Sequence, residues 1–235
     1  MNMPLNTLAD ASDPIEQARY NMIEQQIRPW NVLDTQVLKA LARVHREDYV
    51  PAAYRDMAFA DLELPLHESP LEALRLGQIM LAPRVEARML QDLQLKPTDR
   101  VLEIGTGTGH MAALLASLSA QVLSLEIIPE LVELARRNLS SAGVRNAVVR
   151  QGDGAQPIGD GPFDVIVLSG SVAQLPHILL DQLADGGRFG AIVGHKPMMR
   201  ATFVQRTAQG FEHRELWDVV TARLRSFPEP SPFKF

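Results

Sequence analysis

Several features are missing from this chain of 235 residues, and each absence narrows what the protein can do. There is no cysteine, so disulfides, thiolate catalysis and cysteine-ligated zinc are excluded. No apolar run approaches the roughly 18 residues that a membrane span requires. Lysine and arginine total 23 against 28 aspartates and glutamates, without a dense basic cluster. This balance argues against a dedicated nucleic-acid-binding protein.

The sequence also shows neither the ligand spacing of a metal site nor the features of an export signal. The six histidines show no pairing at the spacing of metal ligands, so we expect no metal site. The N-terminal residues lack the basic region and apolar core of a signal peptide, and we therefore expect a cytoplasmic protein. A hydrophobic content of 46% and a charged content of 22% are ordinary for a globular domain.

The most informative stretch is VLEIGTGTGHM, residues 101–111. Its first four residues predict a short buried strand, and the run that starts at Met111 favours a helix. Between them lie glycines at positions 105, 107 and 109. A strand, a glycine turn and a helix open a nucleotide-binding α/β unit. The glycines permit backbone angles that a Cβ would resist, and they let a ligand approach free N–H groups at the helix start.

A second predicted strand, residues 121–125, is followed by Glu126, 21 positions after Gly105. An acidic side chain at that strand tip is placed to accept hydrogen bonds from both ribose hydroxyls of an adenosine. Taken alone, either motif is also explained by an ordinary tight turn or by an ordinary acidic residue at a strand end. The two motifs at this spacing favour a nucleoside ligand.

Two ligand classes compete for this site. Nicotinamide dinucleotides usually require Gly-x-Gly-x-x-Gly, whereas this chain has Gly-x-Gly-x-Gly. Glu103 would also oppose a pyrophosphate. S-adenosylmethionine carries a sulfonium and an ammonium and has no phosphate, so it fits better. A dehydrogenase remains the weaker alternative.

The remaining pattern predicts an α/β fold with a mostly parallel seven-stranded sheet. Predicted strands cover residues 101–104, 121–125, 146–151, 165–168, 188–193, 202–205 and 215–222. The first predicted helix begins at Pro14 and ends before Pro29. Further predicted helices span 35–44, 84–93, 111–118, 129–141 and 178–183. Residues 61–75 are expected to form a surface loop with one helical turn. We divide the chain into a leader (1–12), a helical extension with a substrate-side loop (13–96), a cofactor-binding α/β domain (97–225) and a proline-rich tail (226–235).

Ligands of open α/β sheets bind beyond the carboxyl ends of the strands. Four predicted strand tips converge on one sheet edge, and we expect the side chain of Asp153, at one of them, to bond the adenine amino group. Alone, the Gly-Asp-Gly segment 152–154 is equally well explained as a plain turn. The convergence, rather than any one motif, supports the cofactor assignment. The predicted cofactor-binding residues are Glu103, Gly105, Thr106, Gly107, Gly109, Glu126, Ile127, Asp153, Gly154 and Ser169.

With these motifs in place, the chain resembles the protein-L-isoaspartate O-methyltransferase family over about Met22 to Val193. Residues 101–109 are almost identical to the first motif of that family, a motif that many methyltransferases share. Similar blocks follow in order: SLE at 124–126, GDG at 152–154, PFDVIV at 162–167 and LADGG at 183–187. More specific similarity lies at 22–27, 37–51 and 77–83. The resemblance implies a Rossmann-like S-adenosylmethionine-dependent methyltransferase domain at 97–225 with an N-terminal helical extension.

The chain departs from the family in the segment before the first motif. The family has Gly-Gln-Thr-Ile-Ser there, and this chain has Gly-Gln-Ile-Met-Leu at 77–81. In the family this loop lies over the sulfonium and contacts the isoaspartyl carboxylate, and the serine is thought to assist catalysis. The resemblance therefore assigns Gln78, Ile79 and Leu81 to the substrate side. Ile79 and Leu81 cannot donate a hydrogen bond, so no catalytic residue is assigned.

Two hypotheses follow. The first is an O-methyltransferase that methylates a carboxylate in damaged protein or an altered acceptor. The second is a catalytically silent, cofactor-binding paralogue that acts as a regulatory or interaction protein. Transfer to an ionised carboxylate needs no strong general base, so proximity, alignment and exclusion of water would supply the rate. Expected partners are an isoaspartyl protein or peptide or a small carboxylate, without nucleic acid or membrane, and we expect a monomer or weak dimer.

Overall fold

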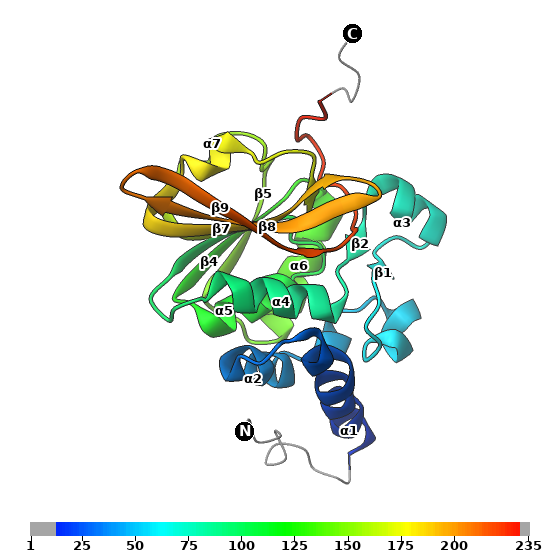
Figure 1. Cartoon of the computed structure of the whole chain (residues 1–235). Helices are drawn as coiled ribbons and strands as arrows, with labels where there is room; N and C mark the ends of the chain where they lie inside the picture. The colour runs from blue at the N-terminus through cyan, green and yellow to red at the C-terminus, as the bar shows by residue number, and fades with distance from the viewer. Residues whose placement is uncertain (1–12, 231–235) are drawn as a thin grey trace.

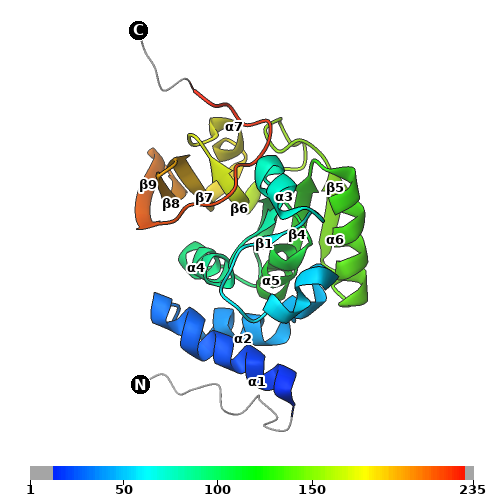
Figure 2. The same cartoon turned by 90° about the vertical axis from the view of Figure 1, so that its right-hand side faces the viewer.

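The computed structural model describes residues 13–230, so the predicted leader and the last five residues of the tail lie outside the described residues. A central seven-stranded sheet has the order β5-β4-β3-β6-β7-β8-β9 (Figures 1 and 2). Its strands are β3 (Arg100–Ile104), β4 (Gln121–Glu126), β5 (Ala147–Gln151), β6 (Phe163–Val172), β7 (Leu183–His195), β8 (Met198–Thr207) and β9 (Gly210–Asp218).

The five neighbouring strands β5, β4, β3, β6 and β7 pair in parallel. At the β7 edge, β8 and β9 add two antiparallel pairings. This arrangement confirms the predicted mostly parallel, seven-stranded sheet. All four parallel pairings place the carboxyl ends of β3, β4, β5 and β6 at the same rim. Predicted strand tips that are far apart in the sequence therefore come together there.

Alternation along the strands divides the core between the two faces of the sheet. Val101, Val122 and Val165 belong to a cluster with helices α4 (Pro83–Leu93) and α5 (His110–Leu118). Leu102, Ile166 and Phe189 point to the opposite face, where α7 (His177–Leu180) packs. A third cluster joins α5 to α6 (Pro129–Ser141). Because both faces are covered, the central strands are buried on both sides.

The N-terminal segment packs beneath α4 and α5 in the view of Figure 1. It comprises α1 (Pro14–Asn21), a π-helical stretch (Met22–Ile27), a 3-10 turn (Arg28–Trp30), α2 (Thr35–Arg43) and further 3-10 turns (Arg46–Asp48 and Ala52–Met57). Asp13 and Asp34 cap α1 and α2 by accepting hydrogen bonds from main-chain N–H groups. Met22, Ile27 and Leu38 join the same core cluster as the sheet, so this extension shares its core with the α/β part.

Several segments differ from the sequence-based expectation; β6, for example, continues to Val172, although the predicted strand ends at residue 168. Within the expected loop 61–75 and just after it, β1 (Leu64–Pro65) pairs with β2 (Ile79–Met80), and α3 (Pro70–Leu76) lies between them. The helix expected at 178–183 covers only His177–Leu180, because Leu183 already pairs with Phe163 as part of β7. The last strand ends at Asp218 instead of residue 222, and the chain then leaves the sheet edge. Within residues 13–230, no helix is long and apolar enough to cross a membrane.

Candidate cofactor and acceptor site

The carboxyl ends of β3, β4, β5 and β6 surround a cavity of about 580 Å³. The cavity brings together most of the residues singled out in the sequence. Those that line it are Gly105, Gly107, Glu126, Ile127, Asp153, Gly154 and Ser169, together with Gln78 and Ile79 on the substrate side.

The glycine loop needs its glycines for conformation and for space. Gly105, Gly107 and Gly109 have φ values of 92°, 54° and 89°, all in the left-handed region. A Cβ on Gly105 would lie 2.8 Å from the side chain of Leu224, and one on Gly107 would lie 3.2 Å from Leu66. Gly109 does not line the cavity; it begins α5 and packs against α6, where a Cβ would lie 3.3 Å from Leu139.

Glu126 links the glycine loop to the start of α6. Its Oε2 atom accepts a hydrogen bond of 2.9 Å from the N–H of Gly107, and its Oε1 atom accepts one of 3.0 Å from the N–H of Ile128. The side chain is buried and lines the cavity. A carboxylate has about four acceptor positions, so these two contacts leave acceptor capacity for a ligand.

The loop after β5 is held close to β3. The Oδ1 atom of Asp153 accepts a hydrogen bond of 2.9 Å from the N–H of Ala155. Gly154 lies so near β3 that a Cβ there would come within 2.3 Å of Ile104. Asp153 lines the same cavity as Glu126, and these carboxylates come from neighbouring strand tips.

Glu103 lies beneath the cavity and is not among the residues that line it. Its side chain is fully buried and accepts hydrogen bonds of 2.7 Å from the hydroxyls of Ser124 and Ser169. Burial raises the pKa of the Glu103 carboxyl to about 8, although these two hydrogen bonds act in the opposite direction. Glu103 is therefore placed to position Ser169 rather than to contact a ligand itself.

Leu81 and Thr106 line a second, smaller cavity of about 270 Å³. It adjoins the first, because both are lined by Ile79, Gly105, Gly107 and Ser169. Leu81 is only 5% exposed and packs in the main core cluster. Of the two positions where the family has hydroxyls, position 79 therefore faces the larger cavity and position 81 does not.

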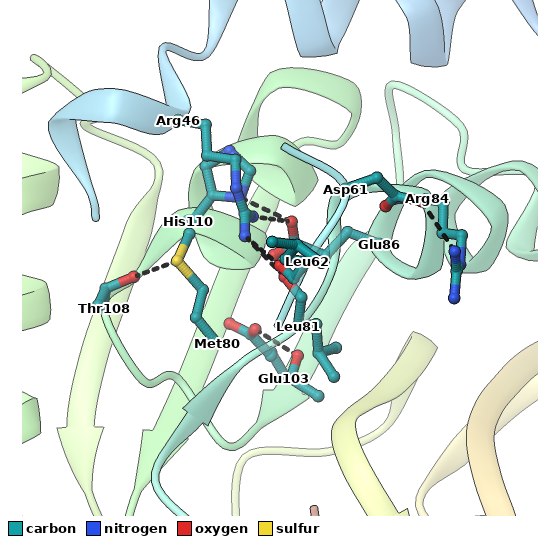
Figure 3. A network of polar contacts seen from close by, with 11 residues as sticks. Arg46, Asp61, Leu62, Met80, Leu81, Arg84, Glu86, Glu103, Thr108 and His110 are labelled. Atoms are coloured by element: carbon teal, nitrogen blue, oxygen red, sulfur yellow. Dashed lines mark hydrogen bonds and ion pairs between the residues drawn. The ribbon is translucent and has the colours of Figure 1, made fainter. Parts of the chain in front are cut away.

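A buried polar network supports the segment that carries Leu81 (Figure 3). Arg46 donates hydrogen bonds of 2.9 Å to the Oε2 atom of Glu86 and to the main-chain oxygen of Leu81. His110 contacts the same Oε2 atom through Nδ1, also at 2.9 Å. All three polar side chains of the network are about 2% exposed. The other ring nitrogen of His110, Nε2, is buried and has no hydrogen-bond partner among the described residues.

Sequence reasoning missed this network, although one signal was present. Glu86 occupies the same helical stripe as Leu90 and Leu93, four and seven positions later, and both leucines are buried. A carboxylate within an apolar stripe indicates a buried partner. Neither Arg46 nor His110 carries a comparable signal, because their positions depend on contacts between distant segments.

The C-terminal segment also lines the first cavity, which the sequence did not predict. Arg223, Leu224, Arg225 and Phe227 all contribute to its wall. Main-chain hydrogen bonds hold this segment against the end of β6: Ser171 donates to Ala222 at 2.8 Å, and Leu224 donates to Ser171 at 2.9 Å. In Figure 2 the segment passes between the end of β6 and α3.

Comparison with known proteins identifies similar chains. The family model described as Protein-L-isoaspartate(D-aspartate) O-methyltransferase matches residues 17–221. A Koribacter versatilis protein named protein-L-isoaspartate O-methyltransferase is 42% identical over 193 residues, which cover 82% of this chain and 83% of that protein. An Aeropyrum pernix protein of the same name is 39% identical over 208 residues, which cover 86% and 76%.

Solved structures support the fold. A Plasmodium falciparum crystal structure, described as a protein-L-isoaspartate O-methyltransferase in complex with S-adenosyl-L-homocysteine, has a TM-score of 0.74 with this chain. The match covers 91% of this chain and 99% of that chain at 21% identity. At this identity the match concerns the fold, and it confirms the Rossmann-like methyltransferase architecture expected from the sequence.

Proposed function

Because this chain belongs to the protein-L-isoaspartate(D-aspartate) O-methyltransferase family, we propose that it methylates a carboxylate of an isoaspartyl residue in a protein or peptide. The observation that carries the proposal is the convergence of residues from four neighbouring parallel strands on one cavity. Proteins of this family use S-adenosylmethionine, which supplies an electrophilic methyl group on a sulfonium when bound.

The residues at the rim fit that cofactor. Glu126 has acceptor capacity for the two ribose hydroxyls, and Asp153 is placed for the adenine amino group. Ile127 adds an apolar side chain to the wall of the same cavity. Two carboxylates facing the cavity would repel a pyrophosphate, and this favours a ligand without phosphate.

The predicted cofactor-binding residues fall into two groups: those that line the cavity, and those that support the glycine loop without lining it. We assign direct contact to Gly105, Gly107, Glu126, Ile127, Asp153, Gly154 and Ser169. Thr106 shares a hydrogen bond of 2.5 Å with Ser124, which also contacts Glu103. Together with Gly109, these side chains support the loop from beneath, so their effect on the cofactor is indirect.

The main task of this chain in the reaction is to position the methyl acceptor and the cofactor. A carboxylate acceptor is ionised near pH 7, so no general base has to remove a proton before transfer. The protein must hold the two reacting groups close and in line, and it must keep water away. Leu66, Ile79 and Leu224 line the cavity and provide an apolar cover for that purpose.

The acceptor half supports a second candidate, a cofactor-binding interaction protein without transferase activity. Ile79 offers no donor to a carboxylate, and Leu81 is buried away from the larger cavity.

The proposed location in the cytoplasm and the proposed monomer or weak dimer remain predictions.

Two measurements on the purified chain test the proposal and separate the candidates. Isothermal titration with S-adenosylhomocysteine tests cofactor binding, and radiolabelled methyl transfer to an isoaspartyl peptide tests the reaction. An otherwise identical aspartyl peptide is the control. Binding with transfer to the isoaspartyl peptide alone supports the transferase. Binding without transfer to either peptide supports the interaction protein, and absence of binding contradicts both.

A further inference from the structure

A second groove, of about 1,380 Å³, adjoins the cofactor-site cavity. The two spaces share part of their walls, namely Leu76, Gly77, Arg223, Leu224 and Arg225. The groove extends from this shared wall to the turn between β7 and β8, where His195 and Lys196 lie. A chain segment lying in the groove would therefore reach the edge of the proposed reaction site.

The groove is cationic, although the whole chain has a net charge of −5. Its lining includes Arg75, His195, Lys196, Arg223 and Arg225, and no aspartate or glutamate from residues 13–230. Two of the arginines are already paired with carboxylates outside the lining. Arg75 contacts Glu72 at 2.6 Å, and Arg223 contacts Glu229 at 2.5 Å.

Lys196 and Arg225 form no ion pair with any carboxylate in the part of the chain that the structure describes. Glu63, which accepts a hydrogen bond of 2.5 Å from the hydroxyl of Thr221, lies close enough to Lys196 for their charges to attract without forming an ion pair. Arg225 donates hydrogen bonds of 3.2 and 3.0 Å to the main-chain oxygen of Leu76. These bonds fix its guanidinium at the shared wall while other N–H donors stay available for an anion.

The chain's own C-terminal segment shows that a carboxylate can approach two of the basic side chains of the groove at once. The Oε1 atom of Glu229 contacts Arg223, and its Oε2 atom lies 3.8 Å from Nδ1 of His195. Leu74 lines the groove and is 65% exposed, so an apolar side chain can pack beside the charges. The surface therefore combines several cations with an exposed leucine next to the reaction site.

We propose that this groove binds an acidic segment of the polypeptide that carries the methyl acceptor. The inference rests on the proposed function and names the substrate class for that same site. Carboxylates beside the target residue would pair with Lys196 and Arg225, and the cationic groove would accelerate encounter with acidic chains. These cations would also supply recognition of negative charge that Ile79 cannot provide.

The test compares two isoaspartyl peptides of equal length, one flanked by glutamates and the other by glutamines. We expect kcat/KM to be about tenfold higher for the glutamate peptide at low salt, and the preference to shrink as ionic strength rises. Lys196→Glu should remove most of the preference, because kcat/KM should fall much further for the glutamate peptide than for the glutamine peptide. Arg137→Glu, which makes the same charge change at an exposed position on α6, is the matched control and should keep the preference.

Binding of the two fluorescently labelled peptides, measured by anisotropy, keeps the inference testable if no transfer occurs. Tighter binding of the glutamate peptide that Lys196→Glu abolishes supports the groove. Equal binding and equal kcat/KM of the two peptides, or the same loss in both variants, overturns it. Failure of the proposed function gives a different result, namely no methylation of either peptide, whether or not the glutamate peptide binds more tightly.

Discussion

The guanidinium of Arg46 donates a hydrogen bond of 2.9 Å to the main-chain oxygen of Leu81. The same guanidinium pairs with Glu86, and both side chains are almost completely buried. A charged side chain of the N-terminal extension thus fixes the segment that carries the substrate-side residues (Figure 3). The extension is part of the site's framework and not only a cover for the core.

Arg46→Met should lower the free energy of unfolding by about 3–5 kcal/mol, because it leaves the buried Glu86 carboxylate without its cation. Urea denaturation measures this change. The double variant Arg46→Met with Glu86→Leu should recover much of the loss, since replacing both partners of a buried pair by apolar groups is often nearly neutral. A single variant within about 0.5 kcal/mol of the wild type would show that the network contributes little.

Glu126→Gln should weaken binding of S-adenosylhomocysteine about 10- to 100-fold. The charged acceptor becomes a neutral amide with one acceptor oxygen, and the N–H groups of Gly107 and Ile128 already compete for it. Hydrogen bonds to charged groups contribute about 1.5–3 kcal/mol, which corresponds to this range. Isothermal titration measures the affinity. Glu130→Gln, at an exposed position on α6, is the control, and an equal effect in both variants would contradict the assignment.

The buried Glu103 should make stability depend on pH. Burial raises the pKa of its carboxyl to about 8 in the folded chain, against an ordinary value near 4.5. Between these values the folded state keeps a proton that the unfolded state releases, so the free energy of unfolding falls as pH rises. The slope from this one group approaches about 1.4 kcal/mol per pH unit.

The variant Glu103→Gln cannot ionise at this position and isolates the effect. Urea denaturation of both proteins at several pH values between 5 and 9 measures it. The wild type should lose stability relative to the variant from about pH 5 to about pH 8, and the difference should then level off. A difference that stays constant with pH would show that Glu103 is not protonated in the folded state.

Much of the rim could be predicted from the sequence because its signals are local. The glycines, Glu126 and Asp153 all lie shortly after the end of a predicted strand, and a parallel sheet brings such positions to one edge. Glu103 shows the limit of that reasoning. It lies within β3, a central strand covered on both faces, so its side chain lies in the interior beneath the cavity.

The other omissions have a common physical cause. Contacts between residues far apart in the sequence bring Arg46, His110 and the segment 221–227 to the site. Such contacts cannot be predicted from the periodicity of the sequence. The segment 221–227 was expected to end a strand and begin an extended tail, but its hydrogen bonds to Ser171 fix it beside the end of β6. Its arginines therefore belong to the site although their sequence context is irregular.

The two positions where the family has hydroxyls should respond differently to restoration. Ile79 is partly buried and lines the larger cavity, so Ile79→Thr places a donor beside the acceptor site. A hydrogen bond to a carboxylate contributes about 1.5–3 kcal/mol, and kcat/KM for an isoaspartyl peptide should rise at least about tenfold. Ile79→Val has nearly the same shape without the hydroxyl and is the matched control. Equal kcat/KM for these two variants would show that position 79 does not contact the acceptor.

Leu81→Ser should act mainly on stability. Leu81 packs in the core at 5% exposure, and truncation of a buried leucine costs about 2–5 kcal/mol. The hydroxyl of a serine at position 81 would face the smaller cavity, which Glu86 and His110 also line, and would lie away from the larger cavity. We therefore expect a lower melting temperature without the gain in kcat/KM that Ile79→Thr produces. A rise in kcat/KM for Leu81→Ser alone would instead place the acceptor carboxylate in the smaller cavity.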